Sequence, residues 1–472
     1  MRKISACILA LVLLASVVPL AITPAGAETL WLPWETGNDK VPKEELANAI
    51  CSYMLGESTI SLEDLRDAAF VFAYWTPETT DDFTLRIFGN ANEDDTIDIR
   101  DLIYLKEVMS GKKPETNLAD ANYDGELNRL DVEQVKLIIL GREKELTIVD
   151  SAERTVTIPK PVGKIVSFAN YNCEVLRSLN AKDKIVGVDE FTKCMKRFFP
   201  EISKLPSVGT VENPDIEAIL SLEPDIALTF GTYEMPYIEE KLEGTGIEVV
   251  SFYFYDPKFL TEEITKLGYI IDRRDEAREF ISFYEGVIDS IKSRTEGIPD
   301  DKKPKVYYEC FWQDYMTGNK YATDNWIIET AGGINIAADV AENSMSIGYP
   351  TVNPEWIIKQ NPDIIIKRSS SPPYGSTGYE FDDDSGAKAL REEIMNRPGF
   401  EAINAVKEGK VYIEDTSLCG FLSVAYRAKV FHPDLFEDLD PQEIHQEYLN
   451  RFQRLDYDLN EHGVFWYPPL ED

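Results

Sequence analysis

Apolar and polar residues follow one helix–turn–strand pattern twice, in residues 213–228 and 353–366. In each stretch an acid opens a short amphipathic helix, a Pro-Asp pair follows, and a continuous apolar run begins. Proline disfavours helical backbone in the residue before it, so the pair ends the helix, and such an apolar run is typical of a parallel strand buried on both faces. The pattern predicts two similar α/β lobes; a chance repeat of a common unit is the alternative. The corresponding residues are Glu217, Pro224, Asp225 and 226–228 in the first stretch and Glu355, Pro362, Asp363 and 364–366 in the second.

Helix and strand patterns alternate over residues 146–258 and again over 303–472, which predicts parallel sheets with helices on both faces. Between these regions, apolar residues from Phe280 to Ile291 recur at helical spacing and predict one continuous helix over residues 274–296. About 20 residues at roughly 1.5 Å each make a rod of about 30 Å, long enough to link two lobes. A hairpin is predicted just before the first lobe, with strands at 147–149 and 155–158.

A second repeat lies in residues 88–141, where two loops rich in oxygen-bearing side chains begin at Asn90 and Asp120. Side-chain oxygens at loop positions 1, 3, 5, 9 and 12, with a backbone carbonyl at position 7, suit calcium, a hard cation that takes about six to eight oxygen ligands. An apolar-periodic helix follows each loop. The predicted calcium ligands are Asn90, Asn92, Asp94, Thr96, Asp98 and Asp101 in the first loop and Asp120, Asn122, Asp124, Glu126, Asn128 and Asp131 in the second.

The order loop–helix–loop–helix, with aspartate at position 12, resembles a type I dockerin, a calcium-dependent module that docks onto cohesins. The second loop fits completely. In the first, Asp95 stands at position 6, where glycine is usual, so this turn would be strained or its calcium affinity lower. The resemblance implies a small all-α calcium-binding domain at residues 87–142 and either a cohesin-like partner or a dock within the chain. Solvated acidic loops without calcium are the alternative.

The first 27 residues have the pattern of a secretory signal peptide, because Arg2 and Lys3 precede an apolar run over 8–22 and Ala25-Gly26-Ala27. No later stretch is long and apolar enough to span a bilayer. We therefore expect export to the cell surface or a periplasm-like space, with the protein peripheral to the membrane. Residues 28–86 predict two short helices, one of them capped by Ser61 with Asp64, and show no chemistry of their own.

The composition and charge of the chain limit the kinds of partner that it can bind. The formal net charge of −36 disfavours nucleic acid and anionic membranes, which are polyanions. Beyond the signal peptide an odd set of five widely spaced cysteines is not a disulfide framework. A single Cys173–Cys194 bridge and buried free thiols both remain open.

Five stretches in order, within residues 146–465, resemble the substrate-binding proteins of ABC importers for vitamin B12, haem and ferric siderophores. They are residues 165–188, residues 205–228, the long helix, and the paired helical stretches of 425–452. The resemblance implies two Rossmann-like lobes, at 146–258 and 303–472 within a domain of 143–472, with ligand in the cleft between them. It also implies that Glu217 and Glu355, one on each lobe, meet arginines of an ABC permease. Helix capping is the alternative role of these two acids.

Ligand contacts are expected from loops at strand ends that face the cleft. Aromatic side chains there would stack on a large organometallic ligand, although each is equally interpretable as core. Lys193, Lys196 and Arg368 are candidates to pair with carboxylates or phosphates on the ligand, but solvated surface charge is the favoured interpretation of each. The predicted ligand-binding residues are Tyr171, Asn172, Tyr233, Trp312, Tyr315, Ser369, Ser370, Tyr374 and Phe421.

Taken together, the sequence predicts a non-enzymatic binding protein that captures a metal chelate (a corrinoid, ferric siderophore or haem) and delivers it to an ABC permease, tethered through the dockerin-like module. The three histidines all lie after residue 431, which disfavours a bare zinc or manganese site with ligands from both lobes. Nucleophile-elbow, zinc-protease and phosphate-loop motifs are missing from the sequence, and no catalytic cofactor is expected. The alternative is a surface scaffold or adhesion component that acts mainly through dockerin–cohesin assembly.

Overall fold

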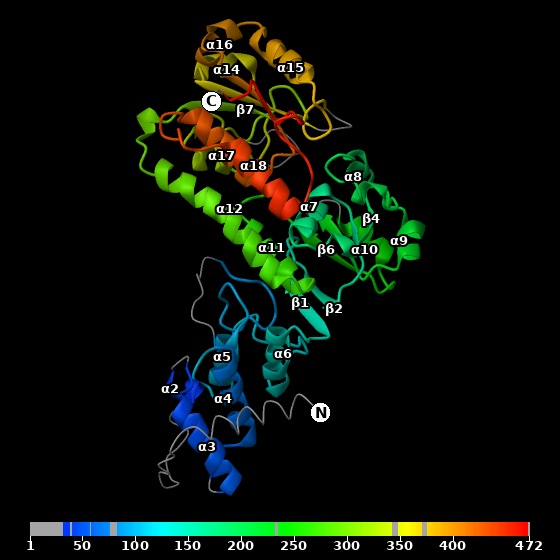
Figure 1. Cartoon of the computed structure of the whole chain (residues 1–472), viewed down its shortest axis with the longest axis vertical. Coiled ribbons are helices and arrows are strands. Elements are labelled where there is room, and N and C mark those ends of the chain that lie inside the picture. The colour runs from blue at the N-terminus through cyan, green and yellow to red at the C-terminus, as the bar shows by residue number, and fades with distance from the viewer. Residues whose placement is uncertain are drawn as a thin grey trace. The chain divides into compact units, whose positions relative to one another are not determined.

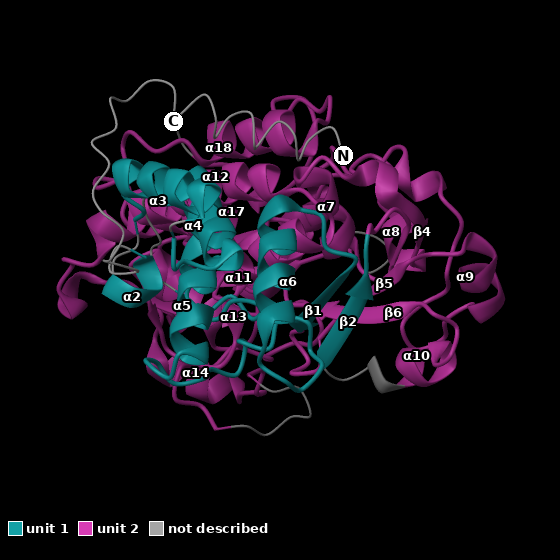
Figure 2. Cartoon of the chain, turned by 90° about the horizontal axis from the view of Figure 1, so that it is seen from below, with its two compact units in different colours: residues 1–149, 155–160 teal, residues 150–154, 161–472 magenta. Residues whose placement is uncertain are grey.

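The computed structural model describes residues 32–37, 40–56, 58–75, 83–231, 235–341, 348–370 and 375–470, without the side chains of residues 235 and 236. The predicted signal peptide lies outside these residues. The chain divides into two compact units (Figure 2), the first formed by residues 1–149 and 155–160 and the second by 150–154 and 161–472. Each unit is described by itself.

Unit 1 is mainly helical. Helix α4 begins as predicted, since the Ser61 hydroxyl accepts a 2.9 Å hydrogen bond from the Asp64 amide. The predicted hairpin is also confirmed, with Val149 opposite Thr155 in an antiparallel pair. The elements are α2 (Pro33–Thr36), α3 (Lys43–Leu55), α4 (Leu62–Tyr74), α5 (Ile99–Met109), α6 (Arg129–Leu140), β1 (Glu145–Val149) and β2 (Thr155–Pro159).

Unit 2 contains two sheets flanked by helices (Figure 1), which confirms the α/β class. The four-stranded sheet of lobe one has the order β4-β3-β5-β6 and is parallel throughout. Its elements are β3 (Ile165–Ser167), α7 (Asn170–Ser178), β4 (Ile185–Val188), α8 (Glu190–Cys194), α9 (Ile216–Leu222), β5 (Ile226–Phe230), α10 (Met235–Leu242), β6 (Glu248–Phe252) and α11 (Leu260–Ile270), with short 3₁₀ turns at Lys182–Lys184 and Ile202–Lys204.

The five-stranded sheet of lobe two has the order β11-β10-β9-β7-β8, parallel except for the last strand of the chain, β11. Its strands are β7 (Lys305–Glu309), β8 (Ile334–Asn335), β9 (Ile364–Ser369), β10 (Val411–Asp415) and β11 (Trp466–Tyr467). Its helices are α13 (Thr323–Thr330), α14 (Pro354–Gln360), α15 (Ser385–Met395), α16 (Asn404–Lys407), α17 (Gly420–Phe431) and α18 (Pro441–Tyr448), with 3₁₀ turns at Asp300–Lys302 and Phe400–Ala402 and a π-helical turn, η5, at Leu449–Gln453.

The repeated helix–turn–strand pattern is confirmed in both lobes, as α9–β5 and α14–β9. In each lobe the residue before the proline takes a left-handed conformation, Glu223 at φ 51° and Asn361 at φ 50°. This conformation ends the helix, because a left-handed residue cannot continue a right-handed helix. The strands that follow are buried, as expected of parallel strands covered on both faces.

The predicted interlobe helix is α12 (Arg274–Thr295), one residue shorter than expected. It packs against α11 and α17 through one apolar face that includes Phe280, Tyr284 and Ile291. All five described cysteines are free thiols, so the Cys173–Cys194 bridge that the sequence left open does not form.

A set of contacts, here called the clasp, joins residues 197–198 of lobe one to residues 379–382 of lobe two. The Arg197 and Phe198 amides donate to one Glu380 carboxylate oxygen at 2.8 and 3.2 Å. The Arg197 guanidinium binds both oxygens of Asp382 at 2.9 and 3.0 Å. The Phe198 ring stacks on Tyr379 with centroids 4.1 Å apart. The clasp therefore holds the two lobes to each other beyond the helix that links them.

Candidate functional site

A cavity of about 350 Å³ lies in unit 2 where the carboxyl ends of β5, β7 and β9 face α7, α12 and the start of α17. Ligands of open parallel sheets bind at such strand ends. The wall is mostly aromatic, which offers apolar burial and ring stacking. The aromatic lining residues are Tyr171, Phe230, Phe254, Tyr255, Phe280, Tyr308, Phe311, Trp312, Tyr349, Phe421 and Tyr448.

Two charged residues, Arg368 and Asp324, line one side of this cavity. Behind them, Arg427 is fully buried and binds both Asp324 and Glu414 at 2.7 Å. Arg368 lies 3.4 Å from Asp324 and 4.0 Å from Glu414, so two guanidinium groups share two carboxylates. Burial acts to raise the pKa of Asp324, but the charges of Arg427 and Arg368 lower it overall. The side is therefore ionised yet close to neutral as a set, and Arg368 is the cation that reaches the cavity.

A third ionisable group, Glu174, enters the lining from α7. Its carboxylate accepts a 2.5 Å hydrogen bond from the Tyr448 hydroxyl of α18. Burial raises the pKa of Glu174 to about 7, against the opposing influence of Tyr448 and Arg177. Gln453 extends the network, since its amide donates to the Tyr448 hydroxyl at 2.7 Å and to the Glu174 carbonyl at 3.2 Å. Burial thus keeps the proton on this carboxyl up to a higher pH than on an exposed glutamate.

The predicted ligand-binding residues fall into three groups. Tyr171, Trp312 and Phe421 line the cavity, with Trp312 58% exposed and Phe421 buried. Four others do not line it: Asn172 donates to the Thr229 carbonyl, Tyr315 lies under the Arg397 guanidinium, Ser369 accepts from Thr377, and Ser370 is half-buried after β9. Tyr233 and Tyr374 lie outside the described residues.

Sequence reasoning missed the ionisable part of the cavity. Arg368 was interpreted as a solvated surface charge, but it is largely buried between Asp324 and Glu414. The usable signal was its place at the end of β9, the strand of the second Pro-Asp unit, because strand ends face the cleft. Lys193 is held by the carbonyls of Ser203 and Leu205, and Lys196 is exposed. No local pattern pointed to Glu174, whose partner Tyr448 is remote in sequence.

The proposed permease-contact acids, Glu217 and Glu355, are both exposed in the first turn of their helices. The N-caps are different residues: the Asp215 side chain accepts from the Ala218 amide and the Asn353 side chain from the Glu355 amide. Both carboxylates are therefore presented outward and are not consumed by capping hydrogen bonds. Their role stays a prediction.

The two oxygen-rich loops of unit 1 share one geometry. Position 4 is left-handed in both, at Glu93 and Tyr123. The asparagine amide at position 3 donates to the aspartate at position 5 at 2.7 Å in each loop. Both following helices begin with a capping box, formed by positions 9 and 12. The loops differ at position 6, where Gly125 takes φ 85° while Asp95 avoids a positive φ, so the expected strain at Asp95 is not seen.

The loops also fit the donor chemistry of calcium. In the first, the Asn90 side-chain oxygen is buried without a hydrogen-bond partner. Burial raises the pKa of Asp101 well above its usual value, and the neighbouring Asp94 adds to this. Burial likewise raises the pKa of Asp131 in the second loop, with Asp120 and Asp124 contributing. A cation would relieve this crowding of carboxylates. Within the described ranges, however, no three acidic, histidine or cysteine side chains converge as a metal group, so asparagine and backbone oxygens would have to complete each site.

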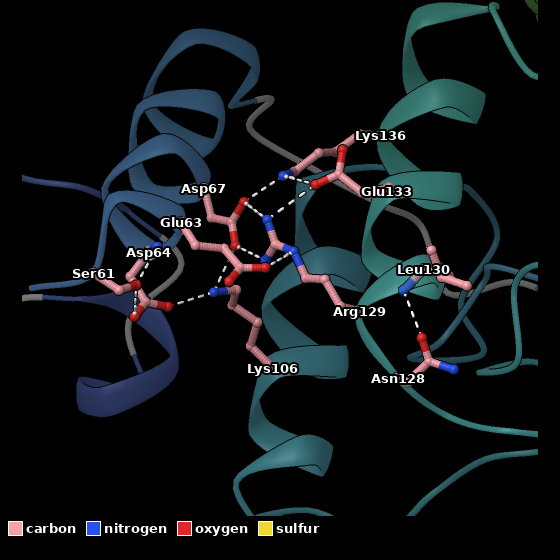
Figure 3. A network of polar contacts seen from close by, with 10 residues as sticks. All are labelled: Ser61, Glu63, Asp64, Asp67, Lys106, Asn128, Arg129, Leu130, Glu133 and Lys136. Carbon is pink, nitrogen blue, oxygen red and sulfur yellow. Dashed lines mark hydrogen bonds and ion pairs between the residues drawn. The ribbon is translucent and has the colours of Figure 1, made fainter.

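Residues 28–86, where the sequence showed no chemistry, supply a buried anion to the two loop helices (Figure 3). Asp67 of α4 is fully buried and pairs with Lys106 of α5 and with Arg129 and Lys136 of α6. Burial would raise the pKa of Asp67, but the Arg129 hydrogen bond and the two lysine charges lower it to about 2. Lys106 and Lys136 follow the first residues of their loops at the same distance in sequence, so they are equivalent positions of the two repeats. Through Asp67, helix α4 therefore contacts both repeats at the same position.

Comparison with known proteins places unit 2 in a family. Residues 165–418 match the family of periplasmic binding proteins. The chain belongs to this family. An uncharacterised ABC transporter substrate-binding lipoprotein of Bacillus subtilis, YvrC, is 27% identical over 308 residues, 62% of this chain and 87% of that protein. The cobalamin-binding protein of Halobacterium salinarum is 25% identical over 60% of this chain and 73% of its own length.

The fold agrees with that assignment. The TroA-like periplasmic binding protein FepB of Veillonella parvula superposes with a TM-score of 0.56 at 23% identity, covering 68% of this chain and 98% of that structure. The relatives named here are binding proteins, in line with the expectation of a non-enzyme. None of the helices in the described ranges combines the length and apolar character that crossing a bilayer takes.

Proposed function

We propose that this protein is an exported substrate-binding component of an ABC importer that captures a metal chelate in the cavity of unit 2. The observation that carries the proposal is the aromatic cavity at the strand ends of a periplasmic binding protein fold. Such a wall suits an organic ligand shell through stacking and apolar burial. The cobalamin-binding relative supports a chelate as the ligand class.

A chelate suits this cavity better than a bare metal ion. The described residues hold no converging set of histidine, cysteine and carboxylate ligands, and a naked transition metal needs such ligands. His445 is unsuited to this role, because burial lowers its pKa to about 3 and its ring nitrogen pairs with the Tyr379 hydroxyl. Arg368 offers the ligand a cationic donor among apolar rings. A volume of about 350 Å³ encloses only part of a corrinoid or haem, so the larger chelates would extend past Trp312 at the exposed edge.

Equilibrium binding tests this proposal. Purified protein is titrated with a corrinoid, a haem, ferric siderophores of catecholate and hydroxamate type, and molybdate as an inorganic anion, each followed by calorimetry and by visible absorbance. One chelate is expected to bind at a single site with micromolar or tighter affinity. Trp312→Ala should weaken that affinity about tenfold, whereas Trp326→Ala, outside the cavity lining, serves as the matched control. Failure of every chelate, or tight binding of molybdate alone, contradicts the proposal.

Delivery to a permease would use Glu217 and Glu355. Their exposure at the first turns of α9 and α14 supports an outward role, since carboxylates there are free to pair with arginines of a membrane partner. Glu217→Gln with Glu355→Gln should leave chelate binding unchanged and reduce uptake in cells. Glu240→Gln with Glu243→Gln, at exposed positions on α10 and in the turn that follows it, removes the same charge as a control. Equal uptake by the two double variants contradicts the docking role.

Unit 1 is proposed to bind calcium in its two loops and to act as the tether. The matching loop geometry and the unpartnered Asn90 oxygen support this. The alternative function, a scaffold acting through a cohesin-like partner, needs the α5–α6 surface to be available. The Asp67 network favours the internal dock over this alternative, because α4 already holds both repeats, and the tether would then use a surface of unit 1 that α4 leaves uncovered.

Calcium titration followed by hydrogen exchange distinguishes the internal dock from the cohesin-binding scaffold. Calcium is expected to slow amide exchange in α5, α6 and also α4, since α4 is part of the same charge network. Peptides covering β7 in unit 2 are the internal control and should not respond. A calcium response confined to α5 and α6, together with capture of a purified cohesin, would contradict the internal dock and favour the scaffold.

A further inference from the structure

The aromatic cavity of unit 2 is poor in positive charge. Among the described residues that line it, Arg368 is the one cation, and Asp324 and Glu174 are the two carboxyl groups. A carboxyl group is either neutral or negative, so these two acids can only oppose an anionic ligand. The lining therefore offers such a ligand a single guanidinium group and up to two repulsive charges.

The charge of Arg368 is already balanced within the fold. Its guanidinium lies 3.4 Å from Asp324 and 4.0 Å from Glu414. The second guanidinium of this group belongs to the buried Arg427, which binds the same two carboxylates at 2.7 Å. A third acid, Asp415, is also near: burial raises its pKa, and the charge of Arg368 opposes this rise. Arg368 can thus donate hydrogen bonds to a ligand oxygen, but it brings no excess positive charge to the cavity.

The α7 side of the cavity holds one acid and one base. Burial raises the pKa of Glu174, and the Tyr448 hydrogen bond and the charge of Arg177 oppose this rise. Arg177 is outside the lining, and its guanidinium donates to the Gln453 side chain and to the Phe198 carbonyl. Its charge is therefore directed at the fold and is matched by Glu174 when that carboxyl is ionised.

The rest of unit 2 adds no excess of positive charge around the cavity. The loop of residues 253–259, which supplies part of the lining, carries one acid, Asp256, and one base, Lys258. The chain as a whole has a formal net charge of −36, which repels anions at long range. The internal stretches of unit 2 outside the described residues contain two glutamates and neither lysine nor arginine in their sequence; they are residues 232–234, 342–347 and 371–374.

We infer that the chelate of the aromatic cavity is uncharged or singly cationic, an inference that rests on the function proposed above. A polyanionic chelate would leave water for a mostly aromatic wall without the cations that burial of its charge requires. An uncharged chelate avoids this cost. Arg368 would donate to a neutral oxygen of the ligand, such as an amide or hydroxamate carbonyl, and Glu174 would accept from an amide or hydroxyl group. Corrinoids and hydroxamate siderophores meet these conditions, whereas catecholate and carboxylate siderophores do not.

Calorimetric titration of the full-length protein with three chelates tests this inference. They are an uncharged ferric trihydroxamate, an uncharged corrinoid and a triply anionic ferric tricatecholate, each at about 0.15 M salt, where long-range repulsion is screened. One of the uncharged chelates is expected to bind at least tenfold more tightly than the tricatecholate. Thr416→Lys adds a cation to the lining and should raise the affinity for the tricatecholate, relative to that uncharged chelate, at least tenfold. Thr245→Lys adds the same charge at an exposed position outside the lining and should change this ratio less than twofold.

The possible failures are distinguishable. Tightest binding of the tricatecholate would overturn the inference and leave the proposed function in place, because the ligand would still be a chelate. Failure of all three chelates would overturn the proposed function and the inference with it. An unchanged ratio in Thr416→Lys, with circular dichroism matching the wild type, would show that shape rather than charge excludes the anion and would overturn the inference. Thr323→Lys, at a second lining position, replaces Thr416→Lys if that variant does not fold.

Discussion

Replacing Asp67 by asparagine tests whether one buried carboxylate holds the helices of unit 1 together. The substitution keeps the shape of the side chain and removes its charge. Lys106 and Lys136, each about 9–10% exposed at the side chain, would then lose the anion they share. The pKa of Asp67 falls from 3.8 to about 2 on folding. Since one pKa unit corresponds to about 1.4 kcal/mol, the ionised carboxylate contributes roughly 2–3 kcal/mol to the stability of unit 1.

Hydrogen exchange measured by mass spectrometry resolves this effect within the full-length chain. Amides of α4, α5 and α6 should exchange roughly 30- to 160-fold faster in Asp67→Asn, the equivalent of about 2–3 kcal/mol. Asp64→Asn is the matched control, because Asp64 lies on the same helix and pairs with the same Lys106 at 2.6 Å but is 35% exposed. Its loss should stay within about 1 kcal/mol. Equal acceleration in the two variants, or none in Asp67→Asn, would refute the argument that burial makes the Asp67 charge decisive.

Three further predictions concern both units. Folding raises the pKa of Glu174 from 4.5 to about 7, so the folded chain retains a proton that the unfolded chain releases. The free energy of unfolding of unit 2, measured by urea denaturation, should therefore fall by up to about 3 kcal/mol as pH rises from 4.5 through 7. This fall should be absent in Glu174→Gln. Glu414→Gln leaves Arg427 and Arg368 buried near each other with one carboxylate, so its urea midpoint should fall by the equivalent of about 3–5 kcal/mol, and a change below about 1 kcal/mol would contradict the shared-charge reading. Chelating calcium with EGTA should lower the melting temperature of unit 1 in the wild type and less so in Asp120→Ala, while unit 2 melts unchanged in both; equal shifts would show that the second loop does not bind the ion.

Local sequence patterns were sufficient to predict many of the helices and strands of unit 2. Pro224 and Pro362 marked the helix ends, and the apolar face from Phe280 to Ile291 gave α12 to within one residue. These features depend on neighbours in the chain, which a pattern can display. The β1–β2 hairpin followed for the same reason.

The candidate site was harder to predict from the sequence, because its polar contacts join residues that are remote in sequence. Glu174 meets Tyr448 across most of unit 2, and neither lies in a pattern that separates it from other helical polar residues. Arg368 lies near the end of a strongly apolar strand, β9, and the two acids that bury it come from α13 and β10. Asp67 stood in a helix with an ordinary amphipathic pattern, so its burial among three cations appeared only once α5 and α6 were placed.

The clasp bears on how cargo is exchanged. The contact of one Arg197 guanidinium nitrogen with both oxygens of Asp382, the contact of two backbone amides with one oxygen of Glu380, and the stacked ring pair must all separate before the lobes can part. Together with the single linking helix, these contacts favour a unit 2 whose two lobes move little relative to each other. In a delivery cycle, loading would then proceed with little rearrangement, and unloading would be the step that a membrane partner has to force.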